Sequence, residues 1–364
     1  MLNINRCKSC LLPKNYPFIV FNVQNICNYC NDYKSTPRFE HKLINKFNFE
    51  KSKKKKYDCL VGLSGGRDSV YGLYLLKEKF GLNPLAYTYD WGFLSDVARM
   101  NISKICGILG VEHILRADSI ENMRYLTSLN VKALLKDIKL GMVPIVQSLD
   151  KRFLQFSKKI AKENSIDMVI HFTGYECEQR DFFMGFAGIN QKIKNNQHMN
   201  SYKFYNKIKL GFYYFKNFLL NKSYFNKSFF LNLEAFYISF FQKNNIIHFY
   251  NYVEWNEIKI EKKLSELGYI RSLDYGGNQW RMGDTQTAFN NFIYKELCGF
   301  TEFDEFRSHQ IRMGHISRDE GLKLLEEDNK PKKGAIDKFC KTINLDPDVF
   351  YKCVKKAKFL NNFI

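Results

Sequence analysis

The stretch VGLSGGRDSVYG, from Val61 to Gly72, decides the fold class. The apolar run CLVGL at 59–63 is typical of a buried parallel strand, and an amphipathic helix is expected from Ser69 to Phe80. A strand, a glycine-rich turn and a helix in this order place the helix N-terminus at the carboxyl edge of a sheet. Unpaired N–H groups and the helix dipole favour an anion there. The stretch therefore predicts a phosphate-binding loop, although it lacks the Walker pattern of two glycines four residues apart followed by Lys and Ser or Thr.

The residues of this loop offer a phosphate different contacts. The two glycines let the backbone come close to it, and the two serines can donate hydroxyl hydrogen bonds. The aspartate can cap the helix or share a Mg²⁺ ion beside the phosphates. A Gly-Gly turn that only precedes a capped helix is the alternative, and the apolar strand directly before the loop argues against it. The predicted nucleotide-binding residues are Ser64, Gly65, Gly66, Arg67, Asp68 and Ser69, of which Ser64, Arg67 and Asp68 are predicted to be catalytic.

Strands and helices alternate on both sides of the loop. Further strands are expected at 84–90, 111–118 and 167–174, and helices at 96–110 and 151–165. Strands separated by helices predict an α/β fold with a doubly wound parallel sheet that is covered on both faces.

Two other strand ends carry candidate site residues. Asp90 ends the run AYTYD at a carboxyl edge where adenine lies in such folds, so we predict that it contributes to the nucleotide site. Thr173, Gly174 and Tyr175 end another strand, and Gly174 is predicted to bind the nucleotide. The carboxylates of Glu176, Glu178 and Asp181 follow closely. They are candidates for Mg²⁺ binding or proton transfer, or else ordinary surface acids.

Two cysteine pairs near the N-terminus have the spacing of a metal site. Cys7 and Cys10 form one C-x2-C pair, Cys27 and Cys30 form another, and sixteen residues separate the pairs. Two such turns can close a tetrahedral four-thiolate site that suits Zn²⁺ and leaves no open position, which predicts a structural zinc ribbon. The first fifty residues are then expected to need the metal to fold.

The composition is that of a folded protein of two or three domains. Of the 364 residues, 45% are hydrophobic, and the net charge of +19 suggests an anionic partner or else the codon usage of an AT-rich genome.

The start MLNINRCKSC has no apolar core of a signal peptide, and no run is long enough for a transmembrane segment. We therefore expect a cytoplasmic protein, in which the ten cysteines serve metal binding or catalysis rather than disulfides.

Four segments follow from these patterns, with a solvated basic linker at 51–58. We predict a zinc-ribbon domain at 1–50, a nucleotide-binding domain at 57–190, an aromatic and basic helical insert at 191–255, and a helical C-terminal region at 256–364. The aromatic insert allows two interpretations: an interfacial membrane helix or partner surface, or ordinary buried helices, and the second is favoured.

The pattern S-G-G-x-D-S at 64–69 resembles the PP-loop of the ATP pyrophosphatases, whose sheet is HUP-like. The resemblance covers the loop and the surrounding sheet, about a third of the chain. It implies that the loop holds the β- and γ-phosphates of ATP, which leave as pyrophosphate while a substrate oxygen attacks the α-phosphate.

The order of the whole chain is similar to that of the N-acetyl sugar amidotransferases of bacterial lipopolysaccharide O-antigen and flagellar sugar synthesis. A four-cysteine ribbon precedes the SGG-x-DS domain, and NYVEWNEIKIEKKLSELGY and IRMGHISRDEGLKLLEED follow it. The similarity implies that a sugar or nucleotide-sugar N-acetyl group becomes an acetamidino group through an adenylylated amide. The ammonia would come from a separate glutaminase pair like HisH–HisF.

The residues allow one check and leave alternatives open. Position 2 is Leu and no cysteine lies in a G-x-C-x-G turn, so the chain has no recognisable glutaminase nucleophile of its own. A tRNA thiolase of the same superfamily is the alternative, but no C-x2-C pair follows Cys30, and nucleic acid is an unlikely partner on this ground. A distant pair such as Cys106 with Cys177 could still meet, and a binding module on an inactive nucleotide fold is a third possibility.

Three arginines of the C-terminal region could bind the carboxylate of a sugar acid, or could lie on solvated helical faces. They are Arg281, Arg307 and Arg312.

Overall fold

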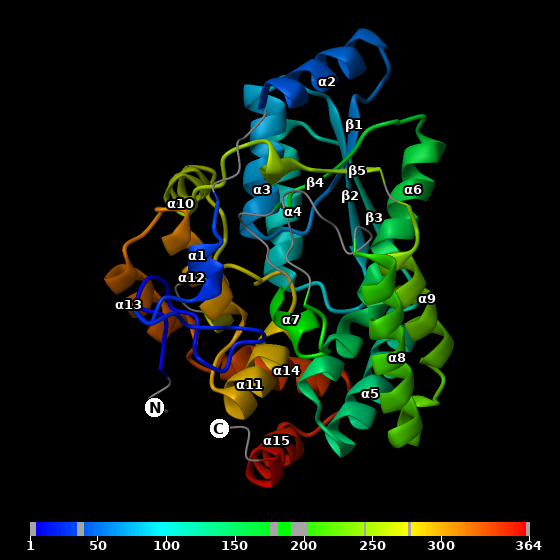
Figure 1. The fold of residues 1–364 in the computed structure, drawn as a ribbon. Coiled ribbons are helices and arrows are strands. Elements are labelled where there is room, and N and C mark those ends of the chain that lie inside the picture. Colours follow the sequence, from blue (N-terminus) through cyan, green and yellow to red (C-terminus); the bar gives the residue numbers. More distant parts are fainter. Residues whose placement is uncertain are drawn as a thin grey trace.

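Five parallel strands form the central sheet (Figure 1). They are β1 (Cys59–Gly62), β2 (Pro84–Asp90), β3 (His113–Ala117), β4 (Val169–His171) and β5 (Ile246–His248), in the order β3-β2-β1-β4-β5. A computed structural model describes residues 5–34, 40–174, 181–190, 202–243, 245–275 and 278–361. Because β1 pairs with β2 on one side and with β4 on the other, the order of strand addition reverses beside β1. In doubly wound folds, ligands bind at the carboxyl ends of the strands where this reversal occurs.

The helices surround this sheet and form a further layer below it in Figure 1. They are α1 (Asn28–Asn31), α2 (Glu40–Ser52), α3 (Arg67–Tyr74), α4 (Asp96–Leu109), α5 (Ile120–Lys136), α6 (Phe153–Glu163), α7 (Asp181–Gly185), α8 (Phe204–Leu220), α9 (Phe229–Phe240), α10 (Glu257–Glu266), α11 (Gln286–Cys298), α12 (Glu302–Arg312), α13 (Arg318–Asp328), α14 (Lys333–Thr342) and α15 (Pro347–Asn361). The 3-10 and π turns are η1 (Leu75–Lys79), η2 (Leu140–Arg152), η4 (Lys222–Tyr224), η5 (Phe249–Asn251) and η6 (Leu273–Tyr275).

The two faces of the sheet pack against different helices. Val61, Ala86 and Ile170 belong to a cluster that includes residues of α3, α4 and α10. The alternate side chains, among them Leu60 and Leu85, pack against α6. Strands buried on both faces require continuous apolar runs, which the sequences of β1 and β2 supply. The predicted doubly wound parallel sheet is therefore confirmed.

Helix α2 and the basic segment after it belong to this sheet rather than to the cysteine-rich start of the chain. Phe47 of α2 joins the cluster of α3, and its ring lies 5.2 Å from that of Phe80. Lys53 and Lys55 contact the carboxylate of Asp167, just before β4, at 2.8 and 2.9 Å. The basic segment is thus partly neutralised at the amino end of the sheet.

The C-terminal region is helical, as the sequence predicts. Its core is aromatic: the ring of Phe289 on α11 lies 4.9 Å from Phe339 on α14 and 4.1 Å from Phe350 on α15. These helices share one apolar cluster with α5 and η2, so the region packs against the rest of the fold.

The aromatic segment differs from the favoured expectation of buried helices. It supplies β5, which the sequence pattern did not predict and which pairs with β4. It also forms α8 and α9, whose inner faces are buried while Phe212 and Phe230 are 68% and 79% exposed. The expectation is therefore wrong for the outer faces of these two helices. None of the helices in the described residues is long and apolar enough to cross a membrane.

Candidate functional site

The loop between β1 and α3 is shaped by one glycine. Gly65 has a φ of +71°, in the region that side chains rarely adopt. A Cβ added there would lie 2.3 Å from the carbonyl oxygen of Ala98, in the first turn of α4. Any side chain at this position would force the loop away from α4. The glycine thus allows the loop to lie against the start of α4, at the carboxyl edge of the sheet.

Two hydroxyl groups meet in this loop. The Oγ atoms of Ser64 and Ser69 lie 3.1 Å apart, and Ser69 Oγ donates to the carbonyl oxygen of Gly66 at 2.9 Å. Helix α3 starts after Gly66, and no side chain among the described residues caps it. Its first N–H groups are therefore available to an anion, as they are in helix N-termini that bind phosphate. The geometry suits the predicted phosphate contacts of this loop.

Asp68 and Arg67, which the sequence predicts to be catalytic, are turned toward α10. Asp68 Oδ1 accepts hydrogen bonds from Trp255 Nε1 and from Arg67 Nε, both at 3.1 Å. The guanidinium of Arg67 is buried, and its Nη1 lies 2.5 Å from Glu257 and 3.4 Å from Glu261. Burial raises the pKa of Asp68, and the charge of Arg67 opposes this. Both side chains fasten the start of α3 to α10, and their part in catalysis stays a prediction.

A chain of buried ion pairs extends from the loop into the C-terminal helices. Glu257 binds Arg67 and also Arg307 of α12, whose Nη1 lies 2.6 Å from Glu257 Oε2. Arg307 Nε in turn lies 2.7 Å from Asp328, at the end of α13. Burial alone raises the pKa of Glu257, but the two guanidinium groups outweigh it and lower the pKa to about 2. The conformation of the loop is thus tied to α10, α12 and α13 by alternating charges.

A segment distant in sequence lies directly beside the loop. A Cβ on Gly283 would be 3.5 Å from the carbonyl oxygen of Ser64, and the Gly283 carbonyl accepts a hydrogen bond from Ser95 N at 3.0 Å. Tyr269 OH donates to the carbonyl oxygen of Gly65 at 3.4 Å. The C-terminal region therefore forms one wall of the loop.

The other two predicted nucleotide residues lie at the same edge of the sheet. Asp90, at the end of β2, is buried; it accepts a hydrogen bond from Gly92 N at 2.8 Å and pairs with Arg99. Gly174 follows β4, and a Cβ there would lie 2.6 Å from the backbone of Tyr250. Gly174 thus permits close packing against η5, the turn that follows β5, and nucleotide binding by Asp90 and Gly174 stays a prediction. The candidate residues Tyr175, Glu176 and Glu178, and the side chain of Asp181, lie outside the described residues.

Four thiols converge near the N-terminus. The Sγ atoms of Cys7 and Cys30 lie 3.9 Å apart, those of Cys10 and Cys27 lie 3.8 Å apart, and all four are within 4.8 Å of one another. Around a tetrahedral zinc with bonds of about 2.3 Å, sulfurs lie about 3.8 Å apart. The N–H group of Cys27 also points at Cys7 Sγ, at 3.2 Å. The predicted four-cysteine group is present and fits Zn²⁺ in a closed structural site; the identity of the metal stays a prediction.

This cysteine knuckle (residues 5–34) is fixed to the C-terminal helices by buried polar contacts. Arg318 Nε donates to the carbonyl oxygens of Cys7 and Cys10 at 3.3 and 3.2 Å. Arg6 Nη1 lies 2.6 Å from Asp304, whose side chain is completely buried in α12. In Figure 1 the knuckle lies beside α12 and α13. The four-cysteine group and the loop at 64–69 are therefore connected through the same helices.

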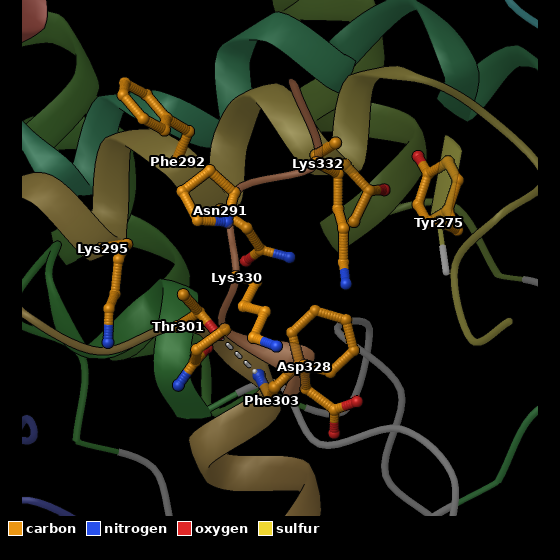
Figure 2. A pocket seen from close by; sticks show the side chains of 13 residues that line it. Tyr275, Asn291, Phe292, Lys295, Thr301, Phe303, Asp328, Lys330 and Lys332 are labelled. Atoms are coloured by element: carbon orange, nitrogen blue, oxygen red, sulfur yellow. Dashed lines mark hydrogen bonds between the residues drawn. The ribbon is translucent and has the colours of Figure 1, made fainter. Parts of the chain in front are cut away.

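A small pocket lies among the C-terminal helices, away from the loop residues (Figure 2). The side chains of Lys330 and Lys332 extend into it, and Asp328, the end of the ion-pair chain, forms part of its wall. Its lining residues are Tyr275, Thr287, Ala288, Asn291, Phe292, Lys295, Thr301, Phe303, Asp328, Asn329, Lys330, Pro331 and Lys332. No residue of 64–69 contributes to it, so the cavity is distinct from the phosphate loop.

The three arginines considered for a sugar carboxylate have different surroundings. Arg307 is buried and held by Glu257 and Asp328, so its guanidinium serves the fold. Arg281 has a φ of +67° and lies 3.5 Å from Glu302, and Arg312 ends α12. Sugar binding by Arg281 or Arg312 stays a prediction.

Sequence reasoning missed the residues that approach the loop from afar. Trp255, Glu257, Tyr269 and Gly283 contact it from positions more than 180 residues later in the chain. The stretch NYVEWNEIK contains two of them, but it stood out only through its resemblance to a family. No local spacing distinguishes such residues from ordinary core and surface positions.

The comparisons with known protein sequences match only a small part of this chain. No family model matches the chain. An uncharacterized protein of Methanocaldococcus jannaschii is 41% identical in an alignment of 73 positions that covers 16% of this chain and 26% of that protein. The chain thus spans about a quarter of the length of the curated relative that it matches.

The comparison with solved structures finds a distant likeness to three synthetases. The NMN synthetase of Francisella tularensis is 12% identical, with a TM-score of 0.35 over 79% of this chain and 94% of that one. The NH3-dependent NAD synthetase of Campylobacter jejuni is 14% identical, with a TM-score of 0.32 over 89% and 96%. The NAD+ synthetase of Burkholderia pseudomallei is 12% identical, with a TM-score of 0.28 over 65% and 91%. At TM-scores this low, the likeness carries no argument about the reaction of this chain.

Proposed function

We propose that this protein is an ATP-dependent, AMP-forming amidotransferase of the PP-loop superfamily. The observation that carries the proposal is the SGG-x-DS loop at 64–69, placed at the reversal of strand order between β1 and β4. Here the unpaired start of α3, the Ser64 and Ser69 hydroxyls and the closely packed Gly65 are arranged to hold the β- and γ-phosphates. The bond that breaks then lies between the α- and β-phosphates.

The acceptor that we propose is the N-acetyl group of a sugar or nucleotide sugar. Its amide oxygen attacks the α-phosphate and pyrophosphate leaves. Ammonia then attacks the activated carbon, and AMP leaves with the former amide oxygen, so that the product is an acetamidine. Mg²⁺ would neutralise the phosphates. The carboxylates that the sequence offers beyond β4 are its candidate ligands. Ser64, Arg67 and Asp68 serve catalysis in this proposal, and the contacts of Arg67 with Glu257 and of Asp68 with Trp255 position the start of α3.

The remaining cysteines support an external source of ammonia. Cys106 and Cys340 are buried, and burial raises their pKa values to about 11 and about 12. Burial also raises the pKa of Cys59 and of Cys298. Thiols of this kind are poor nucleophiles at neutral pH, which argues against a glutaminase or a sulfur carrier at these four positions. We therefore propose that a separate glutaminase supplies the ammonia.

The test is a turnover assay on the purified protein with ATP, Mg²⁺, ammonium and candidate N-acetyl sugars. We expect AMP and pyrophosphate, together with a sugar lighter by the difference between an oxygen atom and an NH group in mass spectrometry. Glutamine alone should give no turnover, and ammonium should work better at alkaline pH, where more of it is NH₃. Substrate-dependent ADP would contradict the proposal, as would pyrophosphate release that is stimulated by tRNA and not by sugars.

A pair of glycine variants ties this activity to the loop. Gly65→Ala should lower kcat by about 10²–10³, since the added Cβ meets the Ala98 carbonyl and moves the phosphate donors. Gly107→Ala on α4 is the matched control, because nothing lies within 4 Å of a Cβ there, and it should leave turnover unchanged. Equal activity of the two variants, both folded, would exclude the loop as the phosphate site.

A further inference from the structure

Helices α8 and α9 form an antiparallel pair, which we call the aromatic hairpin (residues 202–243). Lys207, near the start of α8, lies over the ring of Phe241, just after α9, at 5.4 Å. At the other end, the ring of Phe218 on α8 lies 5.7 Å from that of Phe229 on α9. In Figure 1 the hairpin forms the side of the molecule opposite α12 and α13.

Each helix of the hairpin turns an apolar stripe outward. On α8 five exposed apolar side chains recur at intervals of three or four residues, which places them on one helical face. On α9 a second stripe follows the same spacing. The residues of the two stripes are Phe204, Ile208, Phe212, Phe215 and Leu219 on α8, and Phe230, Leu233, Tyr237 and Phe241 on and just after α9.

These stripes are not needed to hold the hairpin in place. Its inner faces bury Leu210, Phe218 and Ile238, and a neutral network attaches α9 to the body, with Asn232 Nδ2 donating to Asn130 Oδ1 at 2.9 Å. Monomeric proteins rarely expose contiguous apolar patches of this kind, and such patches mark interaction surfaces. The outward residues therefore call for a partner outside the described fold.

The charges around the stripes indicate which partner this is. Residues 202–243 contain seven lysines and a single acidic residue, Glu234, which accepts a hydrogen bond from Gln155 at 2.9 Å. Lys209 and Lys216 are exposed on α8. Helices with an apolar stripe beside lysines bind in the interface of anionic bilayers. A second copy of the same surface would bring like charges together in a twofold contact, which disfavours self-association.

We propose that the aromatic hairpin binds the surface of an anionic lipid bilayer, with α8 and α9 lying in the plane of the membrane. At 17 residues, α8 is about 26 Å long, and neither helix can span the bilayer, so the association is peripheral. The apolar stripes enter the boundary between head groups and acyl chains, and the lysines contact anionic head groups. This proposal is independent of the proposed reaction.

The experiment is co-sedimentation of the full-length protein with vesicles of phosphatidylcholine alone or mixed equally with phosphatidylglycerol. We expect preferential binding to the mixed vesicles and weaker binding at high salt. The double variant Phe212→Ser/Phe230→Ser should bind at least about tenfold more weakly, because two large apolar side chains no longer enter the interface. The double variant Lys209→Glu/Lys216→Glu should also bind the mixed vesicles more weakly. Its binding to vesicles of phosphatidylcholine alone should not change.

The matched control is Ile258→Ser/Leu273→Ser, which removes two exposed apolar residues from outside the hairpin, 69% and 97% exposed. It should bind like the unchanged protein, and thermal melting should show that all variants fold. The proposal is overturned if the unchanged protein ignores anionic vesicles, or if both serine pairs bind equally. It is also overturned if sedimentation velocity shows a dimer that Phe212→Ser/Phe230→Ser dissociates without altering vesicle binding.

Discussion

The cysteine knuckle and the aromatic hairpin lie on opposite sides of the molecule in Figure 1 and are attached in opposite ways. The knuckle is anchored by charged groups, among them Arg6 with the buried Asp304. The hairpin is anchored by uncharged groups, such as the amides of Asn130 and Asn232. The knuckle turns its chemistry inward to four buried or half-buried cysteines, whereas the hairpin turns its apolar side chains outward. The spacing of four cysteines is enough to identify the knuckle from the sequence. The aromatic composition of the hairpin does not reveal which of its side chains are buried and which are exposed.

The largest expected effect breaks the knuckle. Cys7→Ser or Cys27→Ser should remove one tightly bound Zn²⁺ per chain and lower solubility, because we expect the fold of residues 5–34 to depend on the metal. Cys353→Ser is the control, since this half-exposed cysteine lies outside the cluster. Elemental analysis and thermal melting measure both effects. Metal-free protein that stays folded and active would show that the four thiols need no metal.

The anchors of the two regions should differ in strength. Asp304→Ala leaves Arg6 without its carboxylate and removes the acceptor of the Thr301 N–H group, at 2.8 Å, so it should cost about 3–5 kcal/mol of unfolding free energy. Glu234→Ala in the hairpin loses one hydrogen bond to Gln155 and should cost about 1 kcal/mol or less. Urea unfolding measures both. Similar costs would remove the contrast in strength between the two anchors.

The ion pairs of Glu257, which hold the helices behind the knuckle, and the uncharged anchor of the hairpin should also respond differently to acid. The pKa of Glu257 is about 2 in the folded protein, below its ordinary value of 4.5, so its contribution is complete above pH 4.5 and is lost as the pH falls toward 2. This contribution is about 3 kcal/mol. Unfolding measured from pH 6 to about pH 2.5 should therefore have a smaller pH slope in Glu257→Gln. Asn232→Ala, which weakens the uncharged anchor, should lower stability but keep the original slope, and an unchanged slope in Glu257→Gln would contradict this account.

The smallest effect is expected at the outer face of the hairpin. Phe212→Ser or Phe230→Ser should change the unfolding free energy by about 0.5 kcal/mol or less, because both rings are mostly exposed. The same change at Phe218, which is buried against Phe229, should cost about 3 kcal/mol or more. Thermal or urea unfolding measures the difference. A large loss at Phe212 would mean that its ring contributes to the core.

The sequence predicts the parts of this molecule that local patterns encode. The apolar run of β1, the glycines of the loop and the paired cysteines each have a spacing that follows from their chemistry, so the sheet and the four-cysteine group could be predicted. Strand β5 is only three residues long and lies in an aromatic segment without alternation, which hides it from any periodicity. Glu257 and Gly283 reach the loop only through the tertiary fold. Glu257 looks like any acidic residue at the start of a helix and Gly283 like any glycine in a turn, so the local sequence does not indicate their contacts with the loop.

The docking of the knuckle onto α12 and α13 has a consequence for the order of synthesis. Tyr16 OH donates to Glu305 at 2.6 Å across 289 residues of chain, and Leu11 N donates to Ser308 Oγ at 3.0 Å across 297. At roughly 5–20 residues per second, about 15–60 s pass between the emergence of the first partner from the ribosome and that of the second. During this interval the knuckle lacks α12 and α13, and a bound metal ion would keep its turns folded until these two helices are made.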